Sequence, residues 1–329
     1  KMIYFFLIFL NFVFLFFLKP IEKKINIFDI PNEKKIHLKK TSLLGGIIFI
    51  VNITIYLSYE IFFKSTSPSS IFGFSSDIST IIFIFSFIVL FLLGFFDDKK
   101  DLSATLRILA LIVIVMINLM VNPQINISFI KLSFADSFSI GSYSYIWTLL
   151  CFLLFINAFN FFDGINLQIS GLIFAICTFF LTKNIFFNLF LIVLISNFFF
   201  TYLNYNSKTF LGNSGSFFLP FLFGALFISA YNNNSNITSD EIVILMLVPG
   251  MDLLRLFFQR LLERKNPLKG DREHIHHYLM KRYSTILSAL IIQMLIWVPF
   301  ILFQIFGMFF LALIIQVSFY VLIISKYKN

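Results

Sequence analysis

The chain has little charge and almost no cysteine for its length. Only 12% of its 329 residues are charged, whereas 59% are hydrophobic. This balance excludes an ordinary soluble domain, because such a domain could not bury so much apolar surface. The only two cysteines, Cys151 and Cys177, lie inside apolar segments. They therefore indicate neither a disulfide framework nor a thiolate metal site.

Apolar runs long enough to cross a bilayer, roughly 20 residues each, recur along the whole chain. Clusters of Lys, Asn, Ser, Pro and Gly divide these runs into about eleven helices. The sequence therefore predicts an all-α polytopic membrane protein with one integral membrane domain over residues 1–329. The first run lacks a small-residue cleavage site and precedes a basic loop, so it is predicted to be a retained helix. The predicted helices lie near 2–18, 43–63, 78–96, 106–121, 144–159, 167–182, 185–203, 215–231, 240–262, 285–303 and 306–325.

The placement of Lys and Arg predicts the orientation of these helices. If the N-terminus lies outside, nearly all basic residues fall on the inner side, as the positive-inside rule requires. All four histidines then also lie inside. Because polar residues at membrane depth are costly and usually functional, the inner loops are predicted to form one composite site. These loops are 19–42, 97–105, 157–167, 204–216 and 250–284.

The stretch GFFDDKKDLS ends an apolar run with Asp97 and Asp98, and Asp101 follows. Two adjacent carboxylates in a poorly hydrated place favour a nearby cation, or else the pKa of one of them rises. Such a pair can bind magnesium together with phosphate oxygens or supply a general base. The alternative is a solvated helix end. The third aspartate, at DDxxD spacing, favours the functional interpretation.

The stretch NAFNFFDGINL places Asn157, Asn160 and Asp163 three residues apart, on one face of a helix. Buried amides and carboxylates need partners. A hard cation or a sugar hydroxyl would satisfy them, and so would polar contacts between helices. This segment alone leaves both interpretations open.

The stretch TFLGNSGSFFLP is a Gly-rich turn between two predicted spans. Gly212, Gly215 and Ser216 would let backbone N–H groups approach an anion at the start of the next helix. A single GxxGS pattern is weak, and a plain loop is the better interpretation of this segment in isolation.

In VPGMDLLRLFFQRLLERK, the span is predicted to break at Pro249-Gly250. Asp252 and Arg255 share a helix face and can pair. The polar half would then line a hydrated cavity, or it would be an interfacial amphipathic stretch.

The stretch DREHIHHYLMKR gathers Arg272, His274, His276 and His277. Imidazoles beside an arginine suit a diphosphate-like anion, which is the favoured interpretation. A zinc site remains open because His274 and His277 have helical ligand spacing, and so does a structural role. Near the N-terminus, DIPNEKKIHLKKTSLLGG taken alone indicates only a basic juxtamembrane loop.

In order and spacing, the motifs from about Asp29 to His277 together resemble the polyprenyl-phosphate N-acetylhexosamine-1-phosphate transferases of glycosyl transferase family 4. The resemblance implies a multi-pass enzyme of the bacterial inner membrane with a cytoplasmic active site. Such enzymes transfer N-acetylhexosamine-1-phosphate, here first of all GlcNAc-1-phosphate, from a UDP-sugar to undecaprenyl phosphate and release UMP. This is the first membrane step of cell-surface polysaccharide synthesis. It requires magnesium, with manganese as an alternative ion.

The DRxHIHH form of the last motif is similar to the branch that uses UDP-N-acetylhexosamines. The implied partners are the UDP-sugar, the lipid phosphate and the membrane, with no nucleic acid. A homodimer is an expectation of the resemblance alone.

The resemblance also implies roles for single residues. It gives catalytic roles to Asp97, Asp98 and Asp163, and magnesium ligation to Asn160, Asn213 and Asp98. Substrate contacts would come from Lys34, Lys35, His37, Asn157, Asn160, Arg272, His274, His276 and His277.

One position departs from the family pattern. The turn usually reads GDxGS and its aspartate is a principal magnesium ligand, whereas position 213 here is Asn. An amide oxygen brings no charge, so the affinity for magnesium should fall. A weakened family member that only binds lipid phosphate or nucleotide is therefore an alternative. A transporter, or an intramembrane magnesium-dependent prenyltransferase, is a further one, although the latter would need two facing aspartate motifs.

Overall fold

The structure is a computed structural model, and it describes residues 2–31, 40–233, 236–266 and 272–327. These residues are mostly helical, and the strands among them form only two short antiparallel pairs. The predicted all-α class is therefore confirmed. The chain divides into two compact units, unit 1 (residues 1–125 and 176–230) and unit 2 (residues 126–175 and 231–329).

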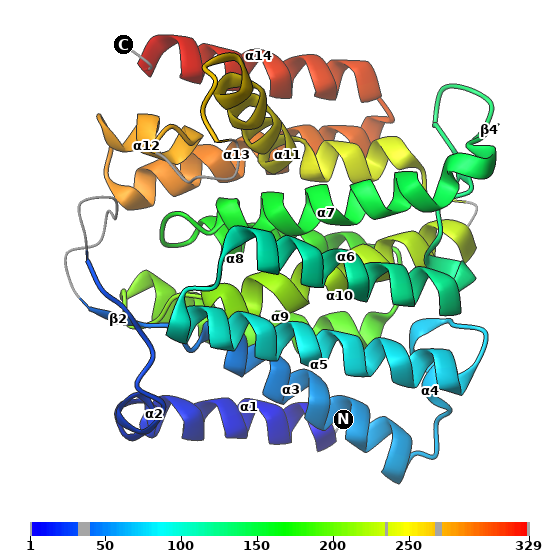
Figure 1. The fold of residues 1–329 in the computed structure, drawn as a ribbon, viewed down its shortest axis with the longest axis vertical. Coiled ribbons are helices and arrows are strands. Elements are labelled where there is room, and N and C mark those ends of the chain that lie inside the picture. The colour runs from blue at the N-terminus through cyan, green and yellow to red at the C-terminus, as the bar shows by residue number, and fades with distance from the viewer. Residues whose placement is uncertain (1, 32–39, 234–235, 267–271, 328–329) are drawn as a thin grey trace. The chain divides into compact units, whose positions relative to one another are not determined.

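Unit 1 contains the N-terminal helices and the long α10, whose apolar stretch is completely buried. Helix α3 packs along α9 (Figure 1). The rings of Phe49 and Phe200, one from each helix, meet edge to face at a centroid distance of 5.7 Å. Paired amides of Asn11 and Asn52 join α1 to α3 at 2.9 Å, which satisfies both groups inside the apolar layer. The elements of unit 1 are α1 (Met2–Phe16), α2 (Leu18–Ile25), β1 (Phe28–Asp29), β2 (Thr41–Ser42), α3 (Gly45–Ser58), α4 (Pro68–Phe72), α5 (Asp77–Lys100), α6 (Ala104–Val121), α9 (Phe187–Tyr205) and α10 (Gly212–Asn233). Helix α3 continues as a π-helix (Tyr59–Phe63), and the last residues of α10 belong to unit 2.

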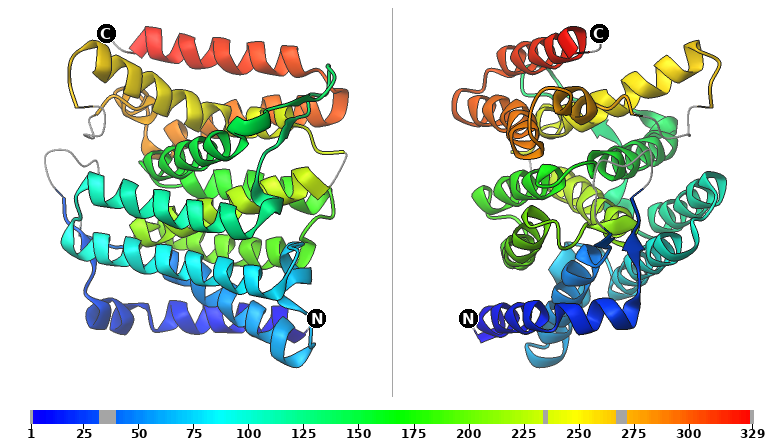
Figure 2. Two further views of the ribbon diagram at one scale, coloured as in Figure 1. Left: turned by 45° about the vertical axis from the view of Figure 1, so that its right-hand side comes forward. Right: turned by 90° about the vertical axis from the view of Figure 1, so that its left-hand side faces the viewer.

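Unit 2 is built around α11, which packs against α7, α13 and α14 (Figure 2). The short α12 lies against α13 and α14. The elements of unit 2 are β3 (Phe129–Ile130), β4 (Phe138–Ser139), α7 (Ser144–Phe162), α11 (Ser239–Leu262), α12 (Ile275–Met280), α13 (Thr285–Phe306) and α14 (Phe309–Tyr327). Helix α8 (Gln168–Thr182) begins in unit 2 and ends in unit 1.

Eight helical segments of the described chain are long and apolar enough to cross a membrane, and α1 with α2, bent by 69°, would make a ninth. The predicted multi-pass membrane protein is thus confirmed, whereas the number of eleven spans and the orientation stay predictions. The other two predicted spans correspond to the shorter α8 and to α11.

The predicted break at Pro249-Gly250 is wrong, because α11 continues through both residues. A proline removes one helical hydrogen bond, but neighbouring helices support such a residue in membrane helices.

Candidate active site

The aspartate pair belongs to the last turn of α5, in unit 1. The helix runs on to Lys100 and ends where Asp101 adopts a left-handed conformation, with φ of 50°. Ser103 then caps α6, which carries Arg107 in its second turn. The short α5–α6 connection therefore brings a cation back beside the carboxylates that precede it.

Asp97 is buried, with 3% of its surface exposed, and it is fully hydrogen-bonded. Its Oδ1 accepts the backbone N–H of Leu102 at 2.7 Å, and its Oδ2 accepts from Arg107 Nη1 at 3.1 Å. Oδ2 also accepts from the Asn213 side-chain amide at 2.8 Å. A solvated helix end is therefore wrong as an interpretation of Asp97.

Asp98 caps the first turn of α10. Its two oxygens accept the backbone N–H groups of Asn213 and Ser214, at 2.9 and 3.1 Å. Gly212 begins this helix at φ of +75°, and an added Cβ there would lie 2.8 Å from Asp98 Oδ2. The glycine-rich turn does bind an anion at a helix N-terminus, as its sequence allows, and that anion is the protein's own carboxylate.

The donor atoms of this cluster suit a hard cation. Two carboxylates and the Asn213 amide are oxygen ligands, the type that magnesium prefers. The Asn213 amide nitrogen must face Asp97, since a carboxylate can only accept, and this leaves the amide oxygen for another partner. Among the described residues, no three His, Cys, Asp or Glu side chains are grouped to hold a metal. The cluster therefore offers oxygen ligands of the type that magnesium prefers, but only two of them carry a negative charge.

The amide helix of unit 2 ends at the predicted motif. Asn157 and Asn160 belong to α7, and Asp163 is the residue that ends it. The Asn157 amide donates to the Leu153 carbonyl of its own helix at 2.7 Å. All three motif side chains are half-buried.

The histidine motif meets this helix end at Gly164. A Cβ on Gly164 would lie 2.1 Å from Cε1 and 2.3 Å from Nε2 of His276. The imidazole therefore rests directly on the backbone that follows Asp163. The two motifs, more than a hundred residues apart in sequence, form one cluster within unit 2.

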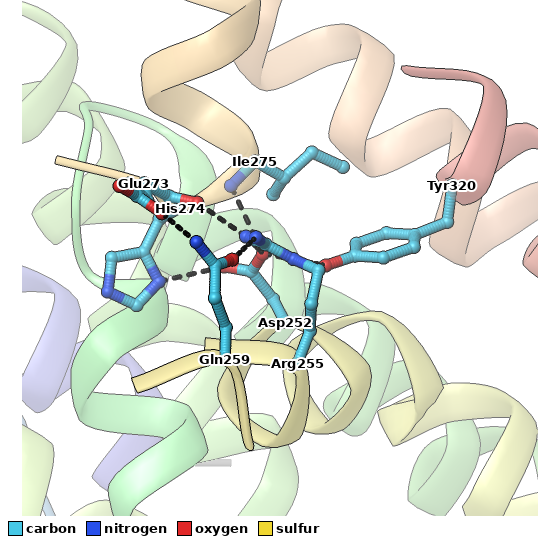
Figure 3. A network of polar contacts seen from close by, with 7 residues as sticks. All are labelled: Asp252, Arg255, Gln259, Glu273, His274, Ile275 and Tyr320. Atoms are coloured by element: carbon cyan, nitrogen blue, oxygen red, sulfur yellow. Dashed lines mark hydrogen bonds and ion pairs between the residues drawn. The ribbon is translucent and has the colours of Figure 1, made fainter. Parts of the chain in front are cut away.

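The three histidines lie close together at the start of α12. The His274 ring is parallel to His276 within 3°, at a centroid distance of 5.5 Å, and it also stacks on Phe161 at 5.5 Å. The rings of His276 and His277 are 4.2 Å apart. Figure 3 shows His274 joined to Asp252 of α11, with Nδ1 2.8 Å from Oδ2. The predicted pairing of Asp252 with Arg255 is confirmed at 3.0 Å.

His276 is buried, and its Nδ1 has no hydrogen-bond partner among the described residues. Burial, together with the neighbouring His277 and His274, lowers the pKa of His276 well below its usual value. A neutral imidazole with an unpaired nitrogen can accept a hydrogen bond from a ligand.

Acid is expected to destabilise the protein through His276. Below pH 6.5 an unfolded chain binds a proton on this ring and the folded chain does not, so stability falls as pH falls through this value. At pH 5 the loss of stability is at most about 2 kcal/mol. His276→Asn should remove this loss of stability. Denaturant unfolding of both proteins at pH 7 and pH 5 would measure the difference. Equal pH dependence of the two proteins would contradict the expectation.

Gly164→Ala is expected to displace the His276 imidazole and lower activity at least tenfold, because misplacement by about 1 Å can cost that much. Thermal unfolding and initial rates would measure the effect. His276→Ala provides the control, since it opens the space that the new methyl group needs. In that background Gly164→Ala should cause little further destabilisation, and an undiminished effect would show that the clash lies elsewhere.

Some of the predicted site residues cannot be placed, and the structure adds two residues that were not predicted. Lys34, Lys35 and His37 lie outside the described residues, and Arg272 is exposed. The structure adds Arg107 and Tyr320, neither of which was assigned from sequence. Arg107 is a lone cation in an apolar run, which is a usable signal, whereas Tyr320 has none.

Comparison with known proteins agrees with these motifs. Residues 80–231 match the model of glycosyl transferase family 4. A Bacillus subtilis protein named "Probable undecaprenyl-phosphate N-acetylglucosaminyl 1-phosphate transferase" is 28% identical over 80% of this chain and 72% of its own length. Undecaprenyl-phosphate alpha-N-acetylglucosaminyl 1-phosphate transferases match as well. The Escherichia coli K12 protein is 26% identical over 85% of this chain and 76% of its own, and the Pasteurella multocida protein is 28% identical over 85% and 79%.

The apolar helices and these matches define a multi-pass membrane enzyme that transfers a phosphate-linked group. Over residues 80–231 the chain is similar to glycosyl transferase family 4, and the matched relatives carry the names of undecaprenyl-phosphate N-acetylglucosaminyl 1-phosphate transferases.

Proposed function

We propose that this protein transfers GlcNAc-1-phosphate from UDP-GlcNAc to undecaprenyl phosphate and releases UMP. The names of the relatives support the lipid and the sugar. The observation that carries the proposal is the contact of His276 with Gly164, because it joins the amide motif to the histidine motif. Both motifs are those that the family resemblance assigns to the nucleotide sugar.

The reaction is a phosphoryl transfer, in which positioning and electrostatics supply most of the catalysis. An oxygen of the lipid phosphate attacks the β-phosphorus of the UDP-sugar and forms the new P–O bond. The bond from that phosphorus to the bridging oxygen breaks, and UMP leaves with the electron pair. A proton on the lipid phosphate, where one is present, passes to a carboxylate.

In unit 2, the histidine cluster would bind the diphosphate. Burial holds His276 neutral, so one of its ring nitrogens carries a proton that can donate to a phosphate oxygen. His274 is fixed by Asp252, and the exposed Arg272 adds a guanidinium for phosphate oxygens. Asn160 and Asp163 lie at the end of α7, next to the Gly164 backbone that His276 contacts.

In unit 1, Asp97 and Asp98 would serve the lipid phosphate. Arg107 holds the Asp97 carboxylate, and the first turn of α10 holds Asp98, so both groups are fixed before substrate binds. Magnesium, when bound, would supply positive charge for the phosphates. Asp97, Asp98 and the Asn213 amide oxygen are the residues of unit 1 that would hold it.

The placement of lysines supports a cytoplasmic site in the bacterial inner membrane. Seven lysines occur between residues 19 and 40, and an N-terminus outside places this segment inside. Dimerisation remains part of the proposal by family resemblance alone.

A donor panel tests the function directly. Purified protein in detergent would receive undecaprenyl phosphate, magnesium and UDP-GlcNAc, UDP-GalNAc or UDP-glucose in separate reactions. UMP and a lipid-linked sugar should form fastest with UDP-GlcNAc. No UMP from any donor would overturn the proposal. If UDP-GalNAc were turned over faster, the proposed reaction would stand and the proposed sugar would be GalNAc instead of GlcNAc.

Asn213 supports a second candidate, a family member that binds its substrates without turning them over. The amide donates to Asp97 where the family pattern has a charged magnesium ligand. Nucleotide binding without UMP release in the same panel would identify this case.

A further inference from the structure

We propose that Asp252 is a positioning residue that fixes the tautomer and the orientation of His274. The inference rests on the proposed function, because it assigns the fixed imidazole to the nucleotide sugar. The cluster involved is drawn in Figure 3, and all of its residues belong to unit 2.

Asp252 is a buried carboxylate that accepts four hydrogen bonds. Oδ2 faces His274 Nδ1 at 2.8 Å, and both side chains are less than 10% exposed. Oδ1 accepts the backbone N–H of Ile275 at 3.1 Å, the Tyr320 hydroxyl at 2.8 Å and Arg255 Nη2 at 3.0 Å. One carboxylate therefore holds both the side chain of His274 and the first residue of α12.

The chemistry of the pair determines where the imidazole proton lies. Three N–H or O–H donors on Oδ1 and the adjacent guanidinium favour the ionised carboxylate. An ionised carboxylate only accepts, so Nδ1 of His274 must carry a proton. In the neutral ring, Nε2 then carries the lone pair, and on protonation it becomes a donor.

A second layer of contacts fixes Asp252 itself. Arg255 Nε donates to the Tyr320 hydroxyl at 2.8 Å, and Arg255 Nη2 donates to the Glu273 carbonyl. Gln259 Nε2 donates to the Glu273 carboxylate at 2.6 Å. Helix α11 thus holds the segment just before α12, and Tyr320 of α14 fixes Asp252 and Arg255 in turn.

Stability alone is a poor explanation for this network. A buried ion pair is often no more stabilising than apolar side chains of similar volume, because both charges lose their hydration. Supporting hydrogen bonds that orient a functional histidine are, by contrast, a recurrent use of buried carboxylates. The Phe161 and His276 rings stacked on His274 restrict its rotation further.

Asp252→Asn tests the proposal with an almost isosteric side chain. The new amide cannot accept from all four donors, so it either loses the bond to His274 or turns an N–H toward Ile275, Arg255 and Tyr320. We expect kcat to fall about 100-fold with KM for the UDP-sugar changed less than threefold. Unchanged kcat in a folded protein would overturn the proposal.

A double-mutant cycle separates positioning from folding. If Asp252 acts through His274, Asp252→Asn should cost less than threefold in a His274→Gln background. Tyr320→Phe removes one donor and keeps the carboxylate, so it should lower kcat only a few-fold. Its loss of thermal stability should be similar to that of Asp252→Asn. Independent, multiplicative effects of Asp252→Asn and His274→Gln would contradict the proposal.

Nitrogen-15 NMR of histidine-labelled protein reads the tautomer without any turnover. The chain has only four histidines, and His274→Gln assigns the signal. Native protein should show a protonated Nδ1 at His274, and Asp252→Asn should shift the proton toward Nε2. If no variant has transferase activity, the proposed function fails while this measurement still decides the positioning. An unchanged tautomer in Asp252→Asn would overturn the inference.

Discussion

Gly94→Ala is expected to abolish activity, with a loss of at least 100-fold. A Cβ at Gly94 would lie 2.2 Å from the Asn213 carbonyl oxygen and 2.5 Å from the Ser214 backbone nitrogen. These are backbone atoms of the first turn of α10, so no side-chain rotation can relieve the overlap. Helices α5 and α10 would have to separate, and Asp98 would lose its two backbone donors.

The same substitution should also lower the free energy of unfolding by about 1–3 kcal/mol, the usual cost of overpacking. Thermal unfolding and initial rates of UMP release would measure both effects. Gly250→Ala is the matched control, because a Cβ there meets nothing within 4 Å and alanine is the better helix residue. Its rate should stay within twofold of the native rate. A fully active Gly94→Ala protein would show that the Asp98 cap is dispensable.

The sequence predicts the class of the fold and the polar motifs that supply most of the two clusters, but not Arg107 or Tyr320. Apolar runs of about 20 residues are sufficient for membrane helices because length and hydropathy are local properties. The pairing of Asp252 with Arg255 is equally local, since residues three apart share a helix face. These predictions need no knowledge of the tertiary structure.

The contacts that make the clusters are not local, and for that reason they were not predicted. Asp98 binds backbone N–H groups 115 and 116 residues away, and no periodicity encodes that meeting. Tyr320 reaches Asp252 from 68 residues further along the chain, inside a largely apolar helix. The predicted break in α11 is wrong for a related reason, because a local proline rule ignores the support of neighbouring helices.

Asn213→Asp is expected to couple the stability of unit 1 to magnesium. The substitution removes the amide that donates to Asp97 at 2.8 Å and places a third carboxylate beside Asp97 and Asp98. Without a divalent cation, the lost hydrogen bond and the repulsion should lower the free energy of unfolding by about 1–3 kcal/mol. Magnesium should restore it, because three carboxylates bind a hard cation better than two and an amide.

Thermal unfolding in EDTA and across a magnesium titration would measure this coupling, and the rate would be followed in parallel. The magnesium concentration for half-maximal rate should fall at least tenfold in Asn213→Asp. Asn213→Ala is the control, since it loses the hydrogen bond without adding charge and should gain no response to magnesium. Identical responses of the two variants would place the metal elsewhere. Activity that exists only in Asn213→Asp would identify the native chain as a binding member of the family.

The expected result gives Asn213 a definite physical effect in the native chain. A neutral donor stabilises the buried Asp97 carboxylate when no metal is bound, at the expense of metal affinity. An aspartate at the same position would reverse this balance, because its charge is compensated only when the cation is present. At the proposed magnesium site, the residue at position 213 would therefore determine whether the carboxylate cluster is held together by hydrogen bonds or by the metal ion.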